Sequence, residues 1–322
     1  MGVVICEWPV KYLQDKLHGI YLGDLWIIGA FSGGGKSTLS RLITMSAHKN
    51  GVPVVLYSLE NAVGTYAREE IRILYNEETG SKLDARMFKK LESERPEDFI
   101  EYRKRVYENS KQKNKDGLRL LVLHEDVNSK NMSVEELLAS IDKEYEQGYR
   151  LFVIDHVDML ITDPRLEMSQ TTHNMNKLWA YVAEKNVAII TFSQMSSTIP
   201  NNVLCPSESD LRGVKTKGQR ATGVITIARH DYGYYKPNNK HPFALPTYIR
   251  IAKNRDGATG CAVCFFETDK YLDEMITEVT CDKQGVVVGG VTKDKLIKFK
   301  LKEDEKKENE CLYQIMPQSG NI

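Results

Sequence analysis

The sequence contains no apolar run approaching the roughly 20 residues that a membrane-spanning helix needs, so we expect no membrane partner. Its first residues, MGVVICEWPV, have neither a basic segment nor a long apolar one, which argues against a secretory signal. The Met-Gly start also lacks a myristoylation signal, because Cys6 stands where Ser or Thr is needed. We therefore expect a cytoplasmic protein, or one that shares the compartment of its substrate.

An excess of charge of either sign is also missing. Lys and Arg total 44, as do Asp and Glu, so the formal net charge is zero. Proteins that coat nucleic acids are usually basic, and composition therefore gives no support for such a partner. It does not exclude one either, because a few cations lining a channel would barely change the total. The hydrophobic content of 41% is ordinary for a globular protein, and 322 residues can bury a full core.

Cysteine is sparse, and the six residues are too dispersed for a disulfide framework in a chain of this length. Cys261 and Cys264 form a CxxC, a spacing used by zinc sites, but the surrounding TGCAVCFFET is rich in strand-forming residues. Positions i and i+3 of a strand point to opposite faces, so these two thiols would not readily share one metal ion. We expect no zinc site at this motif.

Short apolar runs alternate with longer helical patterns along the chain. The runs expected as strands are residues 25–28, 54–57, 120–123, 151–154, 188–192, 223–228 and 248–252. The expected helices are residues 37–49, 63–75, 96–109, 133–147 and 170–185. Nearly continuous Val, Ile and Leu in the strands, alternating with helices, predicts an α/β fold with a mostly parallel sheet flanked by helices on both faces.

The remaining segments divide the chain further. Residues 248–252 and 260–267, around the turn Asn-Arg-Asp-Gly, predict a C-terminal β-hairpin extension of the sheet. Residues 76–118 are polar and highly charged and are expected at the periphery, and residues 231–246 are expected to form a long loop. We predict a short leader over 1–22, an ATPase domain over 23–277, and a partly flexible extension over 278–322 that includes a small β element, GVVVGG.

A phosphate-binding loop begins at Ala30, in the sequence AFSGGGKS. A strand precedes it and an apolar-periodic helix follows it, which is the context that a P-loop requires. Glycines allow successive backbone N–H groups to face the phosphates, and the helix N-terminus adds its dipole. The loop predicts binding of ATP with Mg²⁺, with Lys36 on the β and γ oxygens and Ser37 on the metal. The residues expected to form this cradle are Ser32, Gly33, Gly34, Gly35, Lys36, Ser37 and Thr38.

Asp155 ends the apolar run of residues 151–154. A carboxylate at the C-terminal edge of a parallel strand lies where ligands bind, and it can hold the water shell of Mg²⁺. The alternative is an Asp that caps a following helix, but the P-loop upstream favours the metal role.

Six segments follow one another in the order seen in the motor domains of DnaB-type hexameric replicative helicases. They are GDLWIIGAFSGGGKSTL, VVLYSLE, LFVIDHVDML, TFSQM, SDLRG and IRIAKNRDGATG, and the resemblance covers roughly residues 13–268. The chain thus resembles this family, which implies a RecA-like P-loop NTPase core and an ATP-hydrolysing enzyme.

The resemblance also implies roles for single residues. Glu60 matches the catalytic glutamate that polarises the attacking water, and Gln194 matches the glutamine that senses the γ-phosphate. Lys253 and Arg255 match a basic pair that acts on the nucleotide of a neighbouring subunit, although a solvated pair beside a hairpin turn would look the same. Arg229 matches a position near the nucleotide base.

The segment SDLRG matches the start of a loop that lines the central channel in the family. The cations expected to contact the phosphates of single-stranded DNA are Arg212, Lys215, Lys217 and Arg220. A solvated flexible loop is the alternative. The loop departs from the family in lacking the acidic pattern after Arg212. Since only some twenty residues precede the motor in this sequence, we expect neither the family's N-terminal scaffold domain nor its linker helix.

Three functions remain open at this point. The first is an ATP-dependent helicase or translocase that moves on single-stranded DNA in replication, as a hexameric ring or a filament of copies, with primase or loader proteins as further partners. The second is a RecA-like ATPase that binds or remodels DNA without unwinding it. The third is a binding partner or helicase-loading factor that uses ATP as a switch. Glu60 and Arg255 argue against the third, because a switch needs neither a catalytic carboxylate nor an arginine finger.

Overall fold

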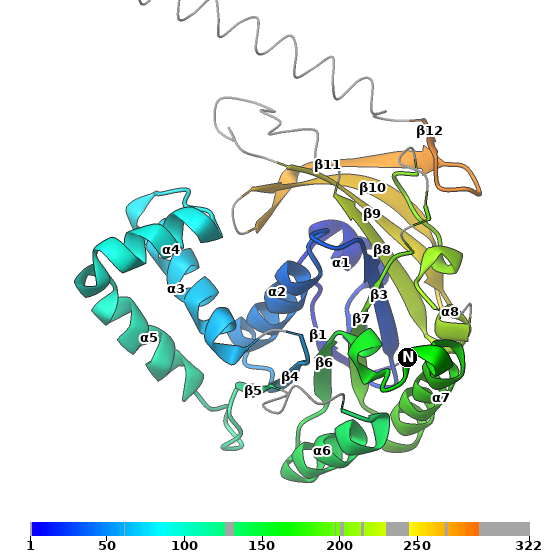
Figure 1. The fold of residues 1–322 in the computed structure, drawn as a ribbon, viewed down its shortest axis with the longest axis horizontal. Coiled ribbons are helices and arrows are strands. Elements are labelled where there is room, and N and C mark those ends of the chain that lie inside the picture. The colour runs from blue at the N-terminus through cyan, green and yellow to red at the C-terminus, as the bar shows by residue number, and fades with distance from the viewer. Residues whose placement is uncertain are drawn as a thin grey trace, which may run out of the picture.

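A ten-stranded sheet forms the centre of the molecule (Figure 1). The computed structural model describes residues 2–60, 62–125, 132–196, 198–199, 203–213, 216–229, 245–267 and 270–289. The strand order is β12-β11-β10-β9-β8-β3-β7-β6-β4-β5. Six neighbouring strands are parallel: β3 (Leu25–Ala30), β4 (Val54–Ser58), β5 (Leu121–Glu125), β6 (Leu151–Asp155), β7 (Ala188–Gln194) and β8 (Gly223–Arg229). The predicted α/β fold with a mostly parallel sheet is confirmed.

Four antiparallel strands extend the sheet beyond β8. They are β9 (Leu245–Asn254), β10 (Gly260–Glu267), β11 (Lys270–Cys281) and β12 (Val287–Gly289). The pairing of β9 with β10 confirms the predicted hairpin. The sequence reading missed β11, and β12 falls in the predicted GVVVGG element.

Helices cover both faces of the parallel strands because the strand residues alternate between two apolar clusters. Trp26 and Ile28 of β3 pack with α1 (Lys11–Leu17) and α2 (Lys36–Lys49) on one face. Leu25 and Ile27 pack with α6 (Val134–Gln147) and α7 (Glu167–Lys185) on the other. The strand β3 is buried along its whole length, as a strand between two helical layers must be.

The N-terminal residues belong to this core. Residues of the predicted leader, among them Trp8 and Leu13, are buried in the same cluster as Ile28. A two-stranded sheet of β1 (Val4–Cys6) and β2 (Ile20–Tyr21) frames α1, and neither strand nor α1 was predicted. The boundaries proposed for the ATPase domain stay a prediction.

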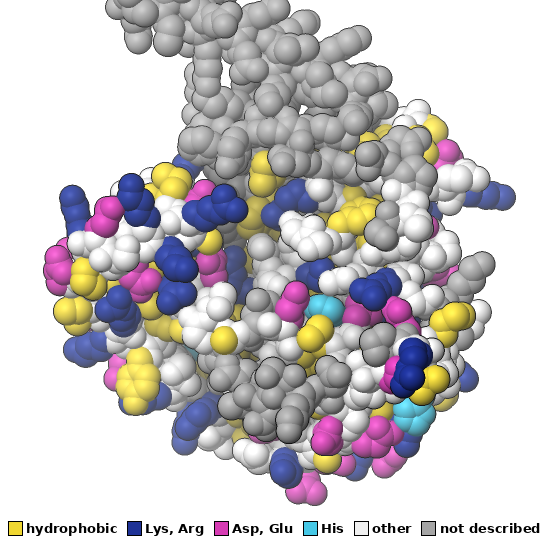
Figure 2. Space-filling model, viewed as in Figure 1, with side chains coloured by type: hydrophobic (Ala, Val, Ile, Leu, Met, Phe, Trp, Pro, Cys, Tyr) yellow, Lys and Arg dark blue, Asp and Glu magenta, His cyan; other side chains and the backbone are white. Residues whose placement is uncertain are grey.

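Helices also form a lobe at one side of the sheet, at the left of Figure 1. It consists of α3 (Val63–Thr79), α4 (Ala85–Glu94), the short 3₁₀ helix η1 (Pro96–Phe99) and α5 (Ile100–Ser110). Phe88, Phe99 and Val106 are buried in a separate apolar cluster within this lobe. On its surface, basic and acidic side chains are interspersed (Figure 2), so this face shows no field of a single sign. None of the described helices is long and apolar enough to cross a membrane.

The strand predicted around Cys261 and Cys264 is confirmed, but the prediction that the cysteines are too dispersed for disulfides is wrong. Cys261 and Cys264 lie on opposite faces of β10, since they belong to different apolar clusters, as the strand reading requires. However, Cys205 and Cys261 are joined by a disulfide, although 56 residues separate them in the sequence. Dispersion along the chain therefore did not exclude a disulfide, because the added strands bring the segment around Cys205 onto β10.

Candidate functional site

The C-terminal ends of five parallel strands bring the predicted nucleotide residues to one edge of the sheet. Strand order places the ends of β8, β3, β7, β6 and β4 side by side. Ala30 is in register with Gln194, and Ser58 with Asp155. In an open α/β sheet this edge is where ligands bind.

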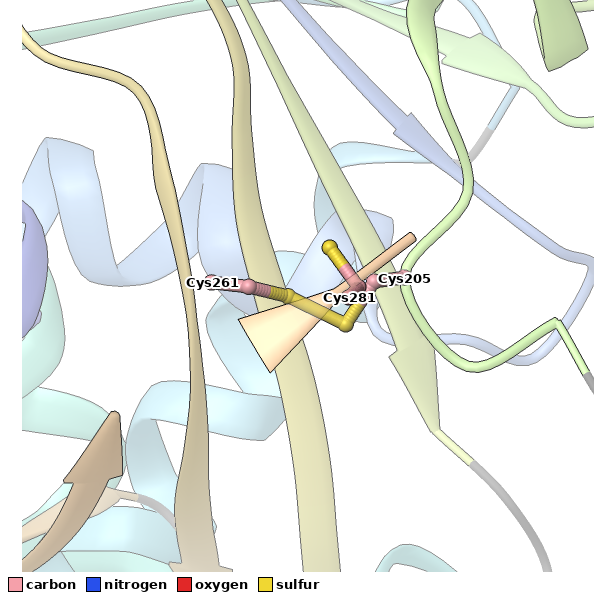
Figure 3. Close-up of side chains that lie close together, drawn as sticks. All are labelled: Cys205, Cys261 and Cys281. Atoms are coloured by element: carbon pink, nitrogen blue, oxygen red, sulfur yellow. A yellow bond between two sulfur atoms is a disulfide. The ribbon is translucent and has the colours of Figure 1, made fainter. Parts of the chain in front are cut away.

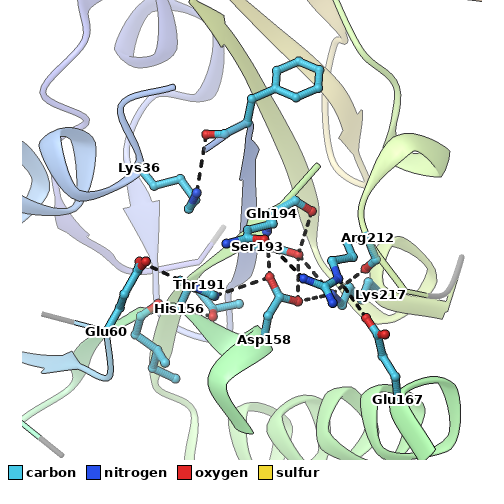
Figure 4. Close-up of polar contacts among 12 residues, drawn as sticks. Lys36, Glu60, His156, Asp158, Glu167, Thr191, Ser193, Gln194, Arg212 and Lys217 are labelled. Carbon is cyan, nitrogen blue, oxygen red and sulfur yellow. Dashed lines mark hydrogen bonds and ion pairs between the residues drawn. The ribbon is translucent and has the colours of Figure 1, made fainter. Parts of the chain in front are cut away.

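The phosphate loop runs from the end of β3 into α2. Gly34 donates its backbone N–H to the carbonyl of Phe31 over 2.9 Å, which closes a tight turn. Gly35 has φ +96°, a left-handed conformation that other residues adopt at a cost, and a Cβ there would lie 3.0 Å from Nη2 of Arg229. Lys36 is largely buried, and its Nζ lies 3.5 Å from the Phe31 carbonyl, so the ammonium folds back over the loop (Figure 4).

Asp155 is the candidate metal residue. It is 4% exposed, and burial raises the pKa of its carboxyl group, an effect that the Ser37 hydroxyl and the nearby His156 and Lys36 oppose and Glu60 reinforces. Its Oδ1 is buried and has no hydrogen-bond partner within the described part of the chain. A buried carboxylate oxygen without a partner, beside a serine hydroxyl at a helix N-terminus, fits the ligand preferences of Mg²⁺.

Glu60 follows β4 and is held near Asp155. The backbone N–H of Leu59 donates to the Asp155 carbonyl over 2.8 Å, which fixes the strand end next to β6. The Glu60 side chain is 44% exposed, so it is open to water. Its Oε2 lies 3.4 Å from Nε2 of the buried His156. Its position at this edge suits a carboxylate that has to orient a water molecule.

The ring of His156 lies between two carboxylates (Figure 4). Its Nδ1 is 3.4 Å from Oδ2 of Asp158, as far as its Nε2 is from Glu60. These separations are long for hydrogen bonds. The ring thus joins the carboxylate at the end of β4 to the one that follows β6.

Asp158 accepts hydrogen bonds from three residues on two elements, β7 and the short helix α8 (Thr216–Arg220). The Gln194 backbone N–H at the end of β7 donates to its Oδ2 over 2.6 Å, and Ser193 Oγ lies 3.3 Å from its Oδ1. The ammonium of Lys217, on α8, forms an ion pair with the same carboxylate. Burial alone would raise the pKa of Asp158, but His156, Lys217 and the Gln194 N–H outweigh it and hold that pKa well below its usual range.

The prediction of a phosphate-binding cation is wrong for Lys217. This residue is 1% exposed, and its Nζ also bonds to Ser193 Oγ at 3.0 Å and to the Arg212 carbonyl at 2.6 Å. All of its hydrogen bonds are directed into the protein, so it cannot reach a strand of DNA without leaving a buried carboxylate unpaired.

The other predicted channel cations differ in their surroundings. Arg212 is exposed; its Nε bonds to Glu167 at 3.0 Å, and its Nη1 lies 3.4 Å from Oε1 of Gln194. Arg220 is also exposed and lies over the ring of Trp179, with 5.0 Å between the guanidinium carbon and the ring centre. Lys215 lies outside the described residues. Arg212 therefore links the candidate DNA loop directly to the predicted phosphate sensor.

Arg229 ends β8 and adjoins the phosphate loop. Its guanidinium lies over the ring of Phe266 at 4.7 Å. Its Nε and Nη2 are buried and lack hydrogen-bond acceptors in the described ranges, and Nη2 is the atom that faces Gly35. Two guanidinium N–H groups without acceptors, beside a phosphate cradle, are well placed to bind an anion.

Lys253 and Arg255 lie at the opposite end of the sheet. Asn254 is in register with Gly223, at the start of β8, and Gly223 is in register with Trp26, near the start of β3. Over the length of β3, at about 3.3 Å per residue, this places the pair on the order of 15 Å from the phosphate loop. Lys253 Nζ bonds to the Gly218 carbonyl at 2.6 Å, and Arg255 Nη2 to that of Gln219 at 3.0 Å. Burial and the adjacent Arg255 lower the pKa of Lys253, partly offset by Glu208. The pair cannot serve the nucleotide site of its own chain in this arrangement.

A pocket of about 280 Å³ opens beside the metal residues, between α2, β4 and the helical lobe. Its lining includes Ser37 and Asp155, and Tyr66 and Glu69 of α3. It continues the candidate metal site toward the lobe.

Two central residues of the site, His156 and Asp158, were not among the predicted ones. Their signal in the sequence was the segment DHVD directly after a buried strand, where three ionisable residues in four positions lie at the ligand-binding edge. Asp155 was predicted as a site residue there, but His156 and Asp158 were not.

The chain was compared with known proteins at three levels. The sequence profile of the family described as "DnaB-like helicase C terminal domain" matches residues 9–272. No curated protein matches the sequence. Among solved structures, one whose title describes an ATPase domain superposes with a TM-score of 0.66 at 19% identity, covering 84% of this chain and 92% of the other. A second, titled "The Structure Of A DnaB-Like Replicative Helicase And Its Interactions With Primase", gives 0.61 at 18% identity; 84% of this chain is covered, but only 64% of the other. At these identities the structural likeness establishes the fold.

Proposed function

Because the chain belongs to the DnaB-like helicase C-terminal domain family, we propose that it is an ATP-driven motor that moves on single-stranded DNA during replication. The observation that carries the proposal is the row of P-loop, Gln194, Asp155 and Glu60 along one edge of the sheet. A phosphate cradle alone would fit any nucleotide-binding protein. The addition of a water-accessible carboxylate next to the metal residue favours hydrolysis.

Each residue of the row has a task in this proposal. The backbone of the loop and Lys36 bind the phosphates, and Ser37 and Asp155 hold Mg²⁺, which neutralises charge on the β and γ phosphates when bound. Glu60 orients the attacking water and accepts its proton. The unpaired N–H groups of Arg229 support a further phosphate or sugar contact beside Gly35.

The contacts of Gln194 suggest how hydrolysis is coupled to DNA. Its backbone carbonyl accepts from the Arg212 N–H at 2.8 Å, and its side chain lies beside the Arg212 guanidinium. A movement of Gln194 toward a γ-phosphate would therefore move the loop that carries Arg212. The buried Lys217–Asp158 pair would keep this loop attached to the sheet during that movement.

A second copy of the chain completes the proposed site. The distance between Arg255 and the phosphate loop of its own chain supports delivery of the arginine to a neighbour in a ring or filament. One solved structure similar to this chain is titled as a helicase with its interactions with primase, and we extend that partner to this chain as part of the proposal.

ATP turnover of the purified chain, measured with and without single-stranded DNA, tests the proposal. We expect turnover that DNA stimulates, loss of turnover in Lys36→Ala, and unwinding of a forked duplex. A folded Lys36→Ala variant with undiminished turnover would reject the P-loop assignment. Stimulated turnover without any unwinding would replace the helicase by a DNA-remodelling ATPase.

A further inference from the structure

Three cysteines from distant parts of the sequence lie close together at the added strands (Figure 3). Cys205 lies in the segment before the 3₁₀ helix η4 (Glu208–Asp210), Cys261 is in β10, and Cys281 ends β11. Their sulfur atoms all lie within 4.8 Å of one another. We infer that these three thiols, in their reduced form, bind a thiophilic divalent cation of the zinc class.

The geometry supports a shared ion. Zinc binds thiolates at about 2.3 Å in a tetrahedral arrangement, which places the sulfur atoms of one site roughly 3.8 Å apart. Sulfurs within 4.8 Å of each other reach that spacing with small side-chain rotations. Three protein thiolates leave one tetrahedral position for water or a fourth donor.

The backbone around Cys205 is fixed by bonds that also involve the turn after Cys281. The Cys205 N–H donates to the Gly285 carbonyl at 2.9 Å, and Arg250 Nη1 donates to the Cys205 carbonyl at 2.7 Å. Gly285 has φ +84°, and a Cβ there would overlap the Cys205 carbonyl, so this close approach requires glycine. Hydrogen bonds around a metal site orient its ligands in this way.

Charge and burial agree with the inference. Three thiolates and a divalent cation carry a net charge of −1, and Arg250 is in register with Cys261 on the neighbouring strand. Cys205 and Cys261 are buried among apolar side chains, whereas Cys281 is only partly buried and would give the ion access to solvent. The dry surroundings on one side would slow loss of the metal.

The disulfide between Cys205 and Cys261 uses two of the same sulfurs, so the disulfide and the metal site exclude each other. A structural disulfide explains two cysteines at this point but not the third. Conversion of the reduced site removes two electrons from the two thiolates, forms the S–S bond and releases the ion. A disulfide such as oxidised glutathione accepts those electrons and becomes two thiols.

The test uses the full chain, reduced with a phosphine and freed of metal by dialysis against a chelator. Titration with Co²⁺ should give the thiolate charge-transfer absorption with a sharp end point at one ion per chain, and Zn²⁺ should displace it. Cys281→Ser should weaken Co²⁺ binding roughly tenfold or more, since it removes a direct ligand. Cys264→Ser is the matched control, because Cys264 is also buried on β10 but faces the opposite cluster; its end point should not change.

Oxidised glutathione should release the Zn²⁺ and leave the protein with two fewer free thiols per chain. Absence of a thiolate band in the reduced wild type, or a Cys281→Ser variant that binds as tightly as wild type, would overturn the inference. Cys205 and Cys261 are buried, so their serine variants could fail to fold. The partly buried Cys281 keeps the test decisive, and a rise of the melting temperature with Zn²⁺ in the wild type but not in Cys281→Ser gives a second readout.

Discussion

Lys217 and Asp158 form an ion pair in which both side chains are largely removed from solvent, with exposures of 2% and 8%. The two residues are 59 positions apart, on elements that follow different strands of the sheet. The pair therefore joins the candidate DNA loop to the edge of the sheet that carries Glu60 and Gln194.

We predict that Lys217→Met and Asp158→Asn each lower the free energy of unfolding by about 3–5 kcal/mol at neutral pH, since either change leaves a buried partner uncompensated. The double variant should lose less than the sum, because neither charge remains and the introduced amide could still accept from the Gln194 N–H. Denaturant unfolding of all four proteins gives the coupling energy. Strictly additive losses, or single losses below about 1 kcal/mol, would mean that the pair is not energetically coupled.

Arg229 should be needed for nucleotide affinity. A charge-assisted hydrogen bond contributes about 1.5–3 kcal/mol, so Arg229→Gln should weaken ATP binding roughly 10- to 150-fold. The change also removes the contact of the guanidinium with the Phe266 ring, so denaturant unfolding of the variant is needed to separate lost stability from lost affinity. Titration calorimetry measures the ATP affinities of the wild type and of Arg229→Gln. Arg103→Ala is the control: this arginine pairs with Glu92 on the surface of the helical lobe, and the variant should bind ATP as tightly as wild type. If Arg229→Gln also bound ATP as tightly as wild type, Arg229 would not belong to the site.

Mixing two inactive variants tests whether Arg255 acts on a neighbour. Glu60→Gln and Arg255→Ala should each lose nearly all ATPase activity, and mixing them should restore part of it as protein concentration rises. An arginine finger contributes on the order of 10³–10⁵ in rate, so even a minority of repaired interfaces is measurable.

The control mixture combines Glu60→Gln with Lys36→Ala. Both changes lie on the phosphate-loop side of an interface, so no arrangement of subunits repairs a site and no recovery is expected. An Arg255→Ala variant that keeps full activity by itself would contradict delivery by a neighbour.

Single-stranded DNA binding should weaken steeply with salt if Arg212 and Arg220 contact phosphates. Each phosphate contact contributes about −0.7 to the slope of log K against log salt, so replacing both arginines by Ala should flatten it by roughly 1.4. Fluorescence anisotropy over a salt series measures the slope. Lys16→Ala is the control, because it removes a cation that pairs with Glu278 and belongs to neither arginine's segment, and it should leave the slope unchanged. An unchanged slope in the double arginine variant would place the DNA path elsewhere.

Glu70 of α3 should make stability depend on pH. Burial raises the pKa of this carboxyl group from 4.5 to about 7, and Arg41 opposes the rise. Between these values the folded chain holds a proton that the unfolded chain has lost, so stability falls as pH rises from about 4.5 to 7 and levels off above. Glu70→Gln should remove this dependence and stabilise the protein at pH 8 by roughly 1–3 kcal/mol. Melting temperatures from pH 4.5 to 8 measure the effect. The exposed Glu94→Gln serves as control, and a pH profile that Glu70→Gln leaves unchanged would reject the assignment.

The parallel sheet and the phosphate loop were predictable because their signals are local. A strand such as β3 is apolar throughout because both of its faces are buried, and the loop's glycines and lysine occupy consecutive positions. The burial of Lys217 had no local signal, because its partner Asp158 is supplied by a distant segment. The same holds for Cys205 and Cys261, whose pairing depends on where the added strands lie.

The helix α4 was missed for a different reason. In this helix Phe88 is the one side chain that is fully buried, and five of its ten residues are charged, so its few apolar positions were not recognised as a helix face. Its start was still readable, because Asp84 caps the backbone N–H groups of Arg86 and Met87 at 2.8 Å. The charge of the surrounding segment masked that signal.

The separate apolar cluster of the helical lobe has a consequence for how the protein opens. Tyr75, Phe88, Phe99 and Tyr102 contact one another, with ring centres 5.0–6.4 Å apart, and belong to a cluster distinct from those that fill the sheet. A segment that is stabilised mainly by its own contacts behaves as an independent cooperative unit. Amide protons of α4 and α5 should therefore exchange with solvent through a sub-global opening, at a lower free energy than those of β3 and β7. The α3 side of the pocket next to Ser37 and Asp155 would then loosen while the turn between β3 and α2 stays folded.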